Sequence, residues 1–263
     1  MGIKHSVIER LRCAKHNWFD GVNFRTHYRR GLYEVRTDDG LVFEFPFNPY
    51  TSFFEIGGYL AEGEWKLEPG MYVLDAGGER GEFSLYASRK VGQTGRVIML
   101  EPDPQSRQLA QQTFGANGGQ PENLVVVDQG LWKEPGQLMF ASGLGGSSVL
   151  VDAGTQIAAS AQSAGAALMS IKVQSLASLI ETMNLPRLDL VKMDIEGAEL
   201  EATEKIGQVL ERHRPRFSIA SYHVRDGEMT SKGLEAMFRD YGYCVRTGFP
   251  LHQTTYAWPK ELD

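Results

Sequence analysis

Cysteine is scarce in this sequence, and long apolar runs and an excess of basic residues are missing. The only two cysteines among 263 residues, Cys13 and Cys244, stand far apart without metal-ligand spacing. We therefore expect free thiols rather than a disulfide framework. No apolar run reaches the roughly eighteen residues of a membrane span, and the first residues lack the apolar core of a signal peptide. These absences predict a cytoplasmic protein without a membrane-spanning segment.

The charge balance is mildly acidic, with a formal net charge of −6. This balance argues against a large nucleic-acid interface. Hydrophobic content of 42% and charged content of 23% are typical of a globular protein. The chain contains no internal repeat, and nothing in it indicates an oligomeric state.

One glycine-rich turn organises the chain. An apolar run over residues 72–74 ends in Asp75 and enters a turn that contains Gly77, Gly78 and Gly81. Beyond the turn, apolar residues recur every four positions, which is helical spacing. The pattern predicts a strand, a tight loop and a helix. In an open parallel sheet, such a loop lies at the carboxyl end of its strand, where ligands bind.

The next apolar run, residues 96–100, ends in Glu101, which follows Asp75 by 26 residues (101 − 75). An acidic residue at this place can accept hydrogen bonds from two ribose hydroxyls, so we expect an adenine nucleoside. Asp75 would repel a pyrophosphate but would attract an ammonium group, which favours S-adenosyl-L-methionine. Two alternatives stay open. A nicotinamide-dependent oxidoreductase would use Glu101 equally well, and a non-catalytic scaffold could keep the same fold.

We predict two parts, an N-terminal extension over residues 1–68 and a core domain over residues 69–263. The extension is expected to hold a helix near residues 6–15, then irregular structure. A β-hairpin follows, with strands at 33–37 and 41–47 around an Asp-Gly turn. A short helix over residues 51–60 would cover the glycine loop, with its aromatic side chains either in the core or serving as a lid.

Strands and helices alternate through the core domain, which predicts a doubly wound α/β fold with a mostly parallel sheet. Residues 142–170 are rich in glycine, serine and alanine without firm periodicity. They form either a mobile loop near the active site or a surface insertion. Because the carboxyl ends of parallel strands share one rim, the residues that end or follow the expected strands should gather there: Asp75, Glu101, Asp128, Asp194 and His223.

Three motifs resemble the FkbM family of methyltransferases. They are Val73-Leu-Asp-Ala-Gly-Gly-Glu-Arg-Gly-Glu-Phe-Ser84, Leu100-Glu-Pro-Asp103 and the narrower Leu188-Asp-Leu-Val-Lys-Met-Asp-Ile-Glu-Gly-Ala-Glu199. The resemblance covers roughly residues 50–225. It implies the class I methyltransferase fold, a Rossmann-like seven-stranded sheet with an antiparallel last strand. It also implies S-adenosyl-L-methionine as cofactor and methylation of a hydroxyl group on a small molecule or glycan.

The resemblance also assigns roles to residues. Asp75, Gly77 and Gly81 would hold the methionine moiety, Glu101 the ribose, and Asp128 with its neighbours the adenine. The full expected cofactor site comprises Asp75, Gly77, Gly78, Gly81, Glu101, Pro102, Asp128, Gln129, Gly130 and Asp194. Two departures from the family pattern, Glu79-Arg80 in the glycine loop and Ala177 where an Asp is common, concern cofactor contacts and substrate positioning.

For the chemical step, we expect Asp194, His223 and Glu196 near the methyl acceptor. A histidine of ordinary pKa suits proton removal, with Asp194 as the alternative base or as the group that orients the imidazole. Glu196 is expected to cap the following helix rather than to face the substrate. Lys192 is expected to form a structural ion pair. No metal site is predicted, because no second ligand stands at a fixed spacing from Asp194.

Overall fold

The structure, a computed structural model, describes residues 3–19, 24–48, 56–144, 147–151, 167–225, 227–250 and 252–262. Within these ranges, no helix is both long enough and apolar enough to cross a membrane. The division into an extension over residues 1–68 and a core over residues 69–263 stays a prediction.

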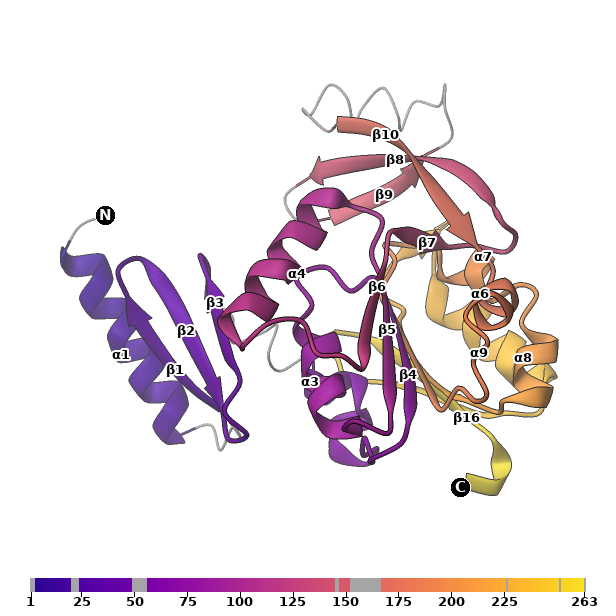
Figure 1. The fold of residues 1–263 in the computed structure, drawn as a ribbon, viewed down its shortest axis with the longest axis horizontal. Helices are drawn as coiled ribbons and strands as arrows, with labels where there is room; N and C mark the ends of the chain where they lie inside the picture. Colours follow the sequence, from indigo (N-terminus) through magenta and orange to yellow (C-terminus); the bar gives the residue numbers. More distant parts are fainter. Residues whose placement is uncertain are drawn as a thin grey trace.

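A seven-stranded sheet forms the centre of the core (Figure 1). Its order is β15-β16-β12-β11-β4-β5-β6, and β16 alone runs antiparallel to its neighbours. This confirms the expected class I methyltransferase sheet. The bounds are β4 Tyr72–Ala76, β5 Arg96–Leu100, β6 Leu124–Val127, β11 Leu190–Met193, β12 Arg216–Ala220, β15 Cys244–Gly248 and β16 Thr254–Trp258.

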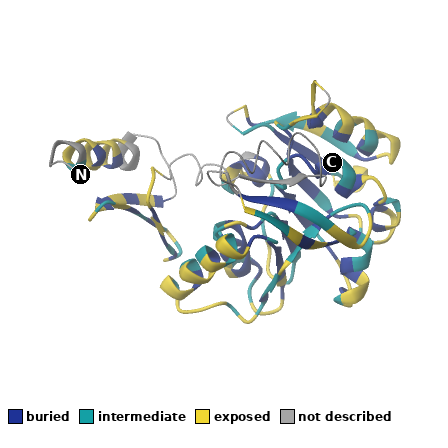
Figure 2. Ribbon diagram, turned by 90° about the horizontal axis from the view of Figure 1, so that it is seen from above, coloured by how far each residue is buried: buried dark blue, intermediate teal, exposed yellow. Residues whose placement is uncertain are grey.

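Helices cover both faces of this sheet, because successive residues of each buried strand point to opposite sides. Val73 packs in one apolar cluster with α3 (Glu82–Val91) and α4 (Pro104–Ala116). Leu74 packs in a second cluster on the other face, with α6, α7, α8 and α9. These four helices span Leu176–Thr182, Glu199–Thr203, Gly207–Arg212 and Thr230–Asp240. The fold is therefore doubly wound, and its strands are largely buried (Figure 2).

Most expected elements of the core have the predicted bounds within a few residues. Asp103 caps α4 as expected, and its carboxylate accepts a hydrogen bond from Gln105 N at 2.8 Å. After β11 the chain forms two short helices, α7 and then, after a break at residues 204–206, α8. A short hairpin, β13 (Val224–Arg225) and β14 (Glu228–Met229), precedes α9.

The N-terminal elements form a separate three-stranded sheet against a long helix (Figure 1). They are α1 (Ile3–Phe19), β1 (Phe24–Arg29), β2 (Leu32–Thr37) and β3 (Val42–Phe45). The predicted helix and hairpin are confirmed, but the expected irregular structure before the hairpin was wrong. β1 alternates buried and exposed residues, and its inward-facing aromatics Phe24 and Tyr28 explain why it pairs with β2. Of the helix expected over residues 51–60, residues 51–55 lie outside the described ranges, and 56–59 are helical.

The segment expected as a loop or surface insertion contains strands in its described part. β8 (Gly136–Leu144), β9 (Ser147–Val151) and β10 (Ala167–Gln174) form a sheet with β7 (Gln129–Leu131) beside the main one. β10 pairs antiparallel with β8, and this backbone pairing forms strands although the side-chain pattern of the segment is weak. Phe140 and Ile171 anchor this small sheet through a buried cluster. Residues 145–146 and 152–166 of the predicted loop lie outside the described residues.

Candidate active site

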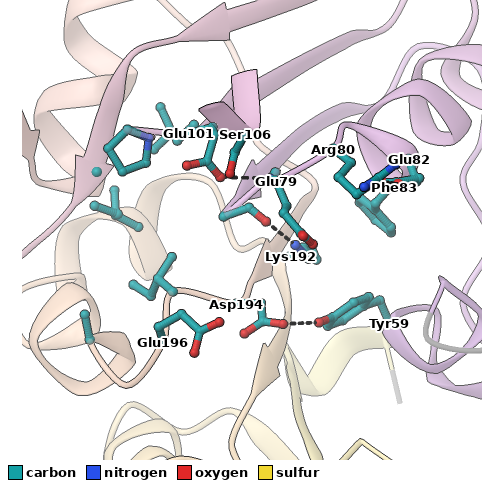
Figure 3. A pocket seen from close by; sticks show the side chains of 18 of the residues that line it. Tyr59, Glu79, Arg80, Glu82, Phe83, Glu101, Ser106, Lys192, Asp194 and Glu196 are labelled. Atoms are coloured by element: carbon teal, nitrogen blue, oxygen red, sulfur yellow. Dashed lines mark hydrogen bonds and ion pairs between the residues drawn. The ribbon is translucent and has the colours of Figure 1, made fainter. Parts of the chain in front are cut away.

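A pocket opens at the carboxyl ends of β4, β5 and β11, where the sequence placed the ligand (Figure 3). The glycine loop forms its floor. Apolar residues of β3, β8 and β10 form part of its walls, and acidic side chains stand at two of its ends. Its lining includes Phe45, Phe47, Tyr59, Gly77, Gly78, Glu79, Arg80, Glu101, Pro102, Gly130, Phe140, Ile171, Lys192, Asp194 and Glu196.

The glycine loop is held tightly between two strands. Gly77 N and Gly78 N both donate to Leu100 O, at 3.0 and 3.1 Å. Gly77 has a φ of +78°, and a Cβ at this position would lie 1.7 Å from the carbonyl oxygen of Asp194. Glycine is therefore required here for both backbone conformation and close packing. Asp194, which follows β11, donates from its backbone N to Ala76 O at 2.9 Å and so ties this strand end to the start of the loop.

Beneath the loop lies a buried ion pair. Lys192 Nζ is 2.9 Å from Asp75 Oδ1 and donates to Gly77 O at 2.7 Å. Asp75 Oδ2 accepts a hydrogen bond from Ser84 at 2.6 Å. Burial opposes the charge on Lys192, but the attraction of Asp75 and Asp194 raises its pKa above the usual value. The expected structural ion pair of Lys192 is confirmed.

This pair changes the expectation for Asp75. The side chain is fully buried and does not line the pocket, so it cannot meet a cofactor ammonium group directly in this conformation. It instead anchors Lys192, which reaches the pocket and holds the loop through Gly77. Asp75 therefore supports the glycine loop through Lys192.

Glu101 marks the other end of the pocket. Its carboxylate accepts hydrogen bonds from Glu79 N and Asp103 N, each at 2.8 Å. The side chain is only 6% exposed, and burial raises its pKa to about 7. A carboxylate has about four acceptor positions, so two remain for ribose hydroxyls. The expected ribose contact fits this geometry.

Arg80 connects the N-terminal sheet to the glycine loop. Its guanidinium lies over the rings of Phe45 and Phe47, with centroid distances of 5.2 and 5.7 Å, and donates to Glu44 O at 3.0 Å. Asn117 makes a second connection, because its amide pairs with both backbone groups of Val42. The unusual arginine of the glycine loop thus brings β3 to the pocket wall.

Asp194 stands at the end of β11 and faces the pocket (Figure 3). Its Oδ2 accepts a hydrogen bond from Tyr59 at 2.8 Å and lies 3.5 Å from His252 Nε2. Burial opposes ionisation, but His252 and Lys192 outweigh it and lower the pKa of Asp194 to about 2. Asp194 is therefore a carboxylate at neutral pH.

His223 follows β12, the strand beside β11, and approaches the same corner. Its Nε2 lies 3.4 Å from Glu196 Oε2 and 4.0 Å from Asp194 Oδ1, and its Nδ1 lies 3.1 Å from Glu199 Oε1. Burial lowers the pKa of His223, but Glu196 and Glu199 outweigh it and raise the pKa to about 10. With these neighbours alone, the imidazole is protonated at neutral pH and cannot accept a proton, which argues against the expected general base of ordinary pKa.

Glu196 does not cap the following helix, so that interpretation was wrong. The N-cap of α7 is Ala198, which makes no side-chain capping bond. The buried Glu199 accepts hydrogen bonds from Ile195 N and Gly197 N instead. Glu196, with a φ of +58°, lines the pocket.

Some of the remaining expected cofactor residues line the pocket, and others lie outside it. Pro102 and Gly130 line the pocket with Gly77, Gly78, Glu101 and Asp194. Gly81 lies below the surface of the pocket, where a Cβ would meet the ring of Phe114 at 2.7 Å. Asp128 lines a separate depression beside α4, together with Arg107 and Gln111. Gln129 lies in β7 and is not part of the pocket lining.

Sequence reasoning missed several side chains of this site. Tyr59 and His252 come from opposite ends of the chain, and neither follows a predicted parallel strand. Glu199 belongs to the quoted Asp-Ile-Glu-Gly-Ala-Glu motif, but its contact with His223 needed the fold. The one available signal was Arg80, whose departure from the family pattern had been noted without a partner.

The residues present fit S-adenosyl-L-methionine. Glu101 offers acceptors for a ribose, and Pro102, Phe140 and Ile171 offer apolar surface for an adenine. The carboxylates of Glu79, Asp194 and Glu196 also line the pocket. Their negative charge suits a sulfonium and an ammonium group. No phosphate-binding cluster of basic residues lines the pocket in the described part of the chain.

Comparisons with known proteins agree with this site. The methyltransferase FkbM domain matches residues 75–245. The fold resembles the crystal structure of methyltransferase FkbM from Methylobacillus flagellatus KT, with 18% identity and a TM-score of 0.52. That match covers 77% of this chain, which spans 47% of the other protein.

A weaker likeness is to Aeropyrum pernix fibrillarin with natively bound S-adenosyl-L-methionine. It shows 14% identity, a TM-score of 0.46, and coverage of 90% of this chain and 98% of the other. No curated protein sequence shows a significant match to this chain. The domain match extends from the ion-paired Asp75 to the sixth strand of the sheet. The chain therefore belongs to the FkbM methyltransferase family.

Proposed function

We propose that this methyltransferase acts on a hydroxyl oxygen of a small molecule or glycan. The observation that carries the proposal is the cluster of Asp194, Glu196 and His223. Asp194 and Glu196 line the pocket at the end opposite Glu101 (Figure 3). A hydroxyl is a poor nucleophile until its proton is drawn away. A polar, negatively charged corner suits this task, whereas an already nucleophilic amine or thiolate would not need it.

The strand order sets the distance between the two ends. Glu101 follows β5 and Asp194 follows β11, with β4 between them. Neighbouring strands lie about 4.8 Å apart, so the two strand ends are separated by about 10 Å. A ribose held at Glu101 leaves room for the rest of the cofactor across the glycine loop. Bound S-adenosyl-L-methionine supplies a methyl group on a sulfonium.

The residues of this chain then have separate tasks. Gly77 and Gly78 let the loop pack closely against Asp194 and Met99, and Lys192 keeps the loop in position. The Asp194 corner orients the acceptor oxygen, and much of the rate comes from this positioning. With S-adenosyl-L-methionine bound, the Asp194 carboxylate would accept the acceptor proton while the acceptor oxygen would take the methyl group from the sulfonium, leaving S-adenosylhomocysteine.

Two substitutions test the proposal. Asp194→Asn and His223→Ala should each lower turnover by about 100-fold while changing S-adenosylhomocysteine affinity only a few-fold. Glu101→Ala should show the reverse pattern, with affinity lost first. Calorimetric titration and initial rates with a hydroxylated acceptor measure both quantities. Near-normal turnover in both corner variants would refute the assigned role of this corner.

A further inference from the structure

We propose that Asp194, Glu196 and His223 form a binding site for a divalent cation at the acceptor end of the pocket. One ligand atom from each residue lies within 4.8 Å of the others. No regular spacing of ligand residues along the chain indicates such a site. The fold creates it, because His223 follows a strand that pairs in parallel with the strand before Asp194.

The donor spacing fits a shared cation. His223 Nε2 is 3.4 Å from Glu196 Oε2 and 4.0 Å from Asp194 Oδ1. Donors on a common cation lie about 3–4.5 Å apart when each metal–ligand bond is about 2.0–2.4 Å long. Two carboxylates and one imidazole suit Mg²⁺, Mn²⁺, Fe²⁺ or Zn²⁺.

A buried carboxylate orients the imidazole. Glu199 is fully buried, and its Oε1 lies 3.1 Å from His223 Nδ1. This contact directs Nε2 toward Asp194 and Glu196. Metal-binding histidines commonly place the second ring nitrogen against a carboxylate in this way. Glu199 is therefore a positioning residue for the site.

The donor atoms have unused capacity. Asp194 Oδ1 and His223 Nε2 are buried atoms without a hydrogen-bond partner among the described residues. A buried polar atom without a partner is destabilising, and a cation would satisfy both. Two basic side chains near the cluster have other partners. Lys192 binds Asp75 and Gly77, and Arg225 binds Gly197 and Glu201.

Asp194 and Glu196 line the pocket, so the proposed cation would face a ligand there. Three protein ligands leave open positions for water or a substrate oxygen. A hydroxyl bound at such a position loses its proton more readily. This catalytic role rests on the proposed O-methyl transfer, whereas cation binding itself rests only on the three side chains and their spacing.

Mn²⁺ titration of the chelator-treated full chain, followed by electron paramagnetic resonance, tests the site. We expect one saturable Mn²⁺ per chain, with affinity lowered at least tenfold by Asp194→Asn, Glu196→Gln and His223→Gln. Glu199→Gln should weaken binding by about 10–100-fold. Glu201→Gln on the same helix, whose carboxylate binds Arg225, is the matched control and should leave it unchanged.

S-adenosylhomocysteine affinity, measured on every variant, verifies that each chain is folded. Absence of saturable Mn²⁺ binding to a wild-type chain that binds S-adenosylhomocysteine would overturn the proposal. Equal Mn²⁺ affinity in all three folded ligand variants would do the same. If Mn²⁺ binds as expected but chelator leaves methyl transfer unchanged, the site stands and its catalytic role is refuted. If Mn²⁺ binds and no hydroxylated acceptor is methylated, only the proposed function fails.

Discussion

The ammonium group of Lys192 lies 2.9 Å from Asp75 Oδ1, and the two side chains are 7% and 0% exposed. This buried ion pair connects the central strand β4 to its neighbour β11. The same ammonium group donates to Gly77 O in the glycine loop. The stability of the sheet and the shape of the pocket therefore depend on one charge pair.

Removing the lysine should destabilise the protein strongly. Lys192→Met leaves Asp75 buried without its cation, and such a change costs about 3–5 kcal/mol. Chemical denaturation measures this loss of unfolding free energy. Lys90→Met, which breaks the more exposed pair with Asp39, is the control and should cost about 1 kcal/mol or less. Adding Asp75→Asn to Lys192→Met should restore part of the loss. Equal costs for the two lysine variants would contradict a stabilising role of the buried pair.

A methyl group at Gly77 should damage the site. In Gly77→Ala, the new Cβ would lie 1.7 Å from Asp194 O, so the loop and the end of β11 must separate. We expect unfolding free energy to fall by more than about 2 kcal/mol and S-adenosylhomocysteine affinity to fall at least tenfold. Gly118→Ala is the matched control, because Gly118 also has a positive φ but no atom within 4 Å of the added Cβ. It should cost about 1–2 kcal/mol and leave affinity intact.

Cofactor affinity should depend on pH through Glu101. Burial raises the pKa of this carboxyl to about 7, so the free protein holds a proton there below that pH. Ribose hydroxyls donate to the ionised form, and binding must first remove the proton. The dissociation constant of S-adenosylhomocysteine should therefore rise about tenfold for each pH unit below 7 and level off above it.

Glu101→Gln provides the comparison for this pH effect. The amide does not titrate, so affinity should be weak and nearly independent of pH over the same range. Calorimetric titrations at about pH 5.5, 6.5 and 8 separate the two behaviours. A wild-type pH profile that Glu101→Gln reproduces would place the titrating group elsewhere.

Much of the fold followed from the sequence because the buried strands are strongly apolar. Residues 96–100 were predicted with the bounds that β5 has. The strand segments within residues 142–170 were harder to predict, since the glycines, serines and alanines there give no clear alternation. Their partners lie on other segments, and pairing between segments decides their structure.

The site was predicted in part for a similar reason. Glu101 and Asp194 follow apolar strands directly, so their positions on the rim could be inferred from strand order. The ion pair that removes Asp75 from the pocket depends on the register of β11 against β4, where Lys192 stands opposite Asp75. Tyr59 lies 135 residues before Asp194 in the sequence. His252 lies 193 residues after Tyr59 and is therefore also distant from Asp194 along the chain. Contacts of this length leave no local pattern.

The nature of the methylated atom tests the account most directly. The full chain would be incubated with S-adenosyl-L-methionine that carries ¹³C in its methyl group and with a panel of monosaccharides, glycosides and hydroxylated small molecules. ¹³C NMR would then identify the labelled product. We predict a labelled O-methyl signal with at least one acceptor, lost in Asp194→Asn although that variant still binds S-adenosylhomocysteine. A labelled product that carries only N-methyl or C-methyl groups, or an O-methyl signal undiminished in Asp194→Asn, would contradict the account.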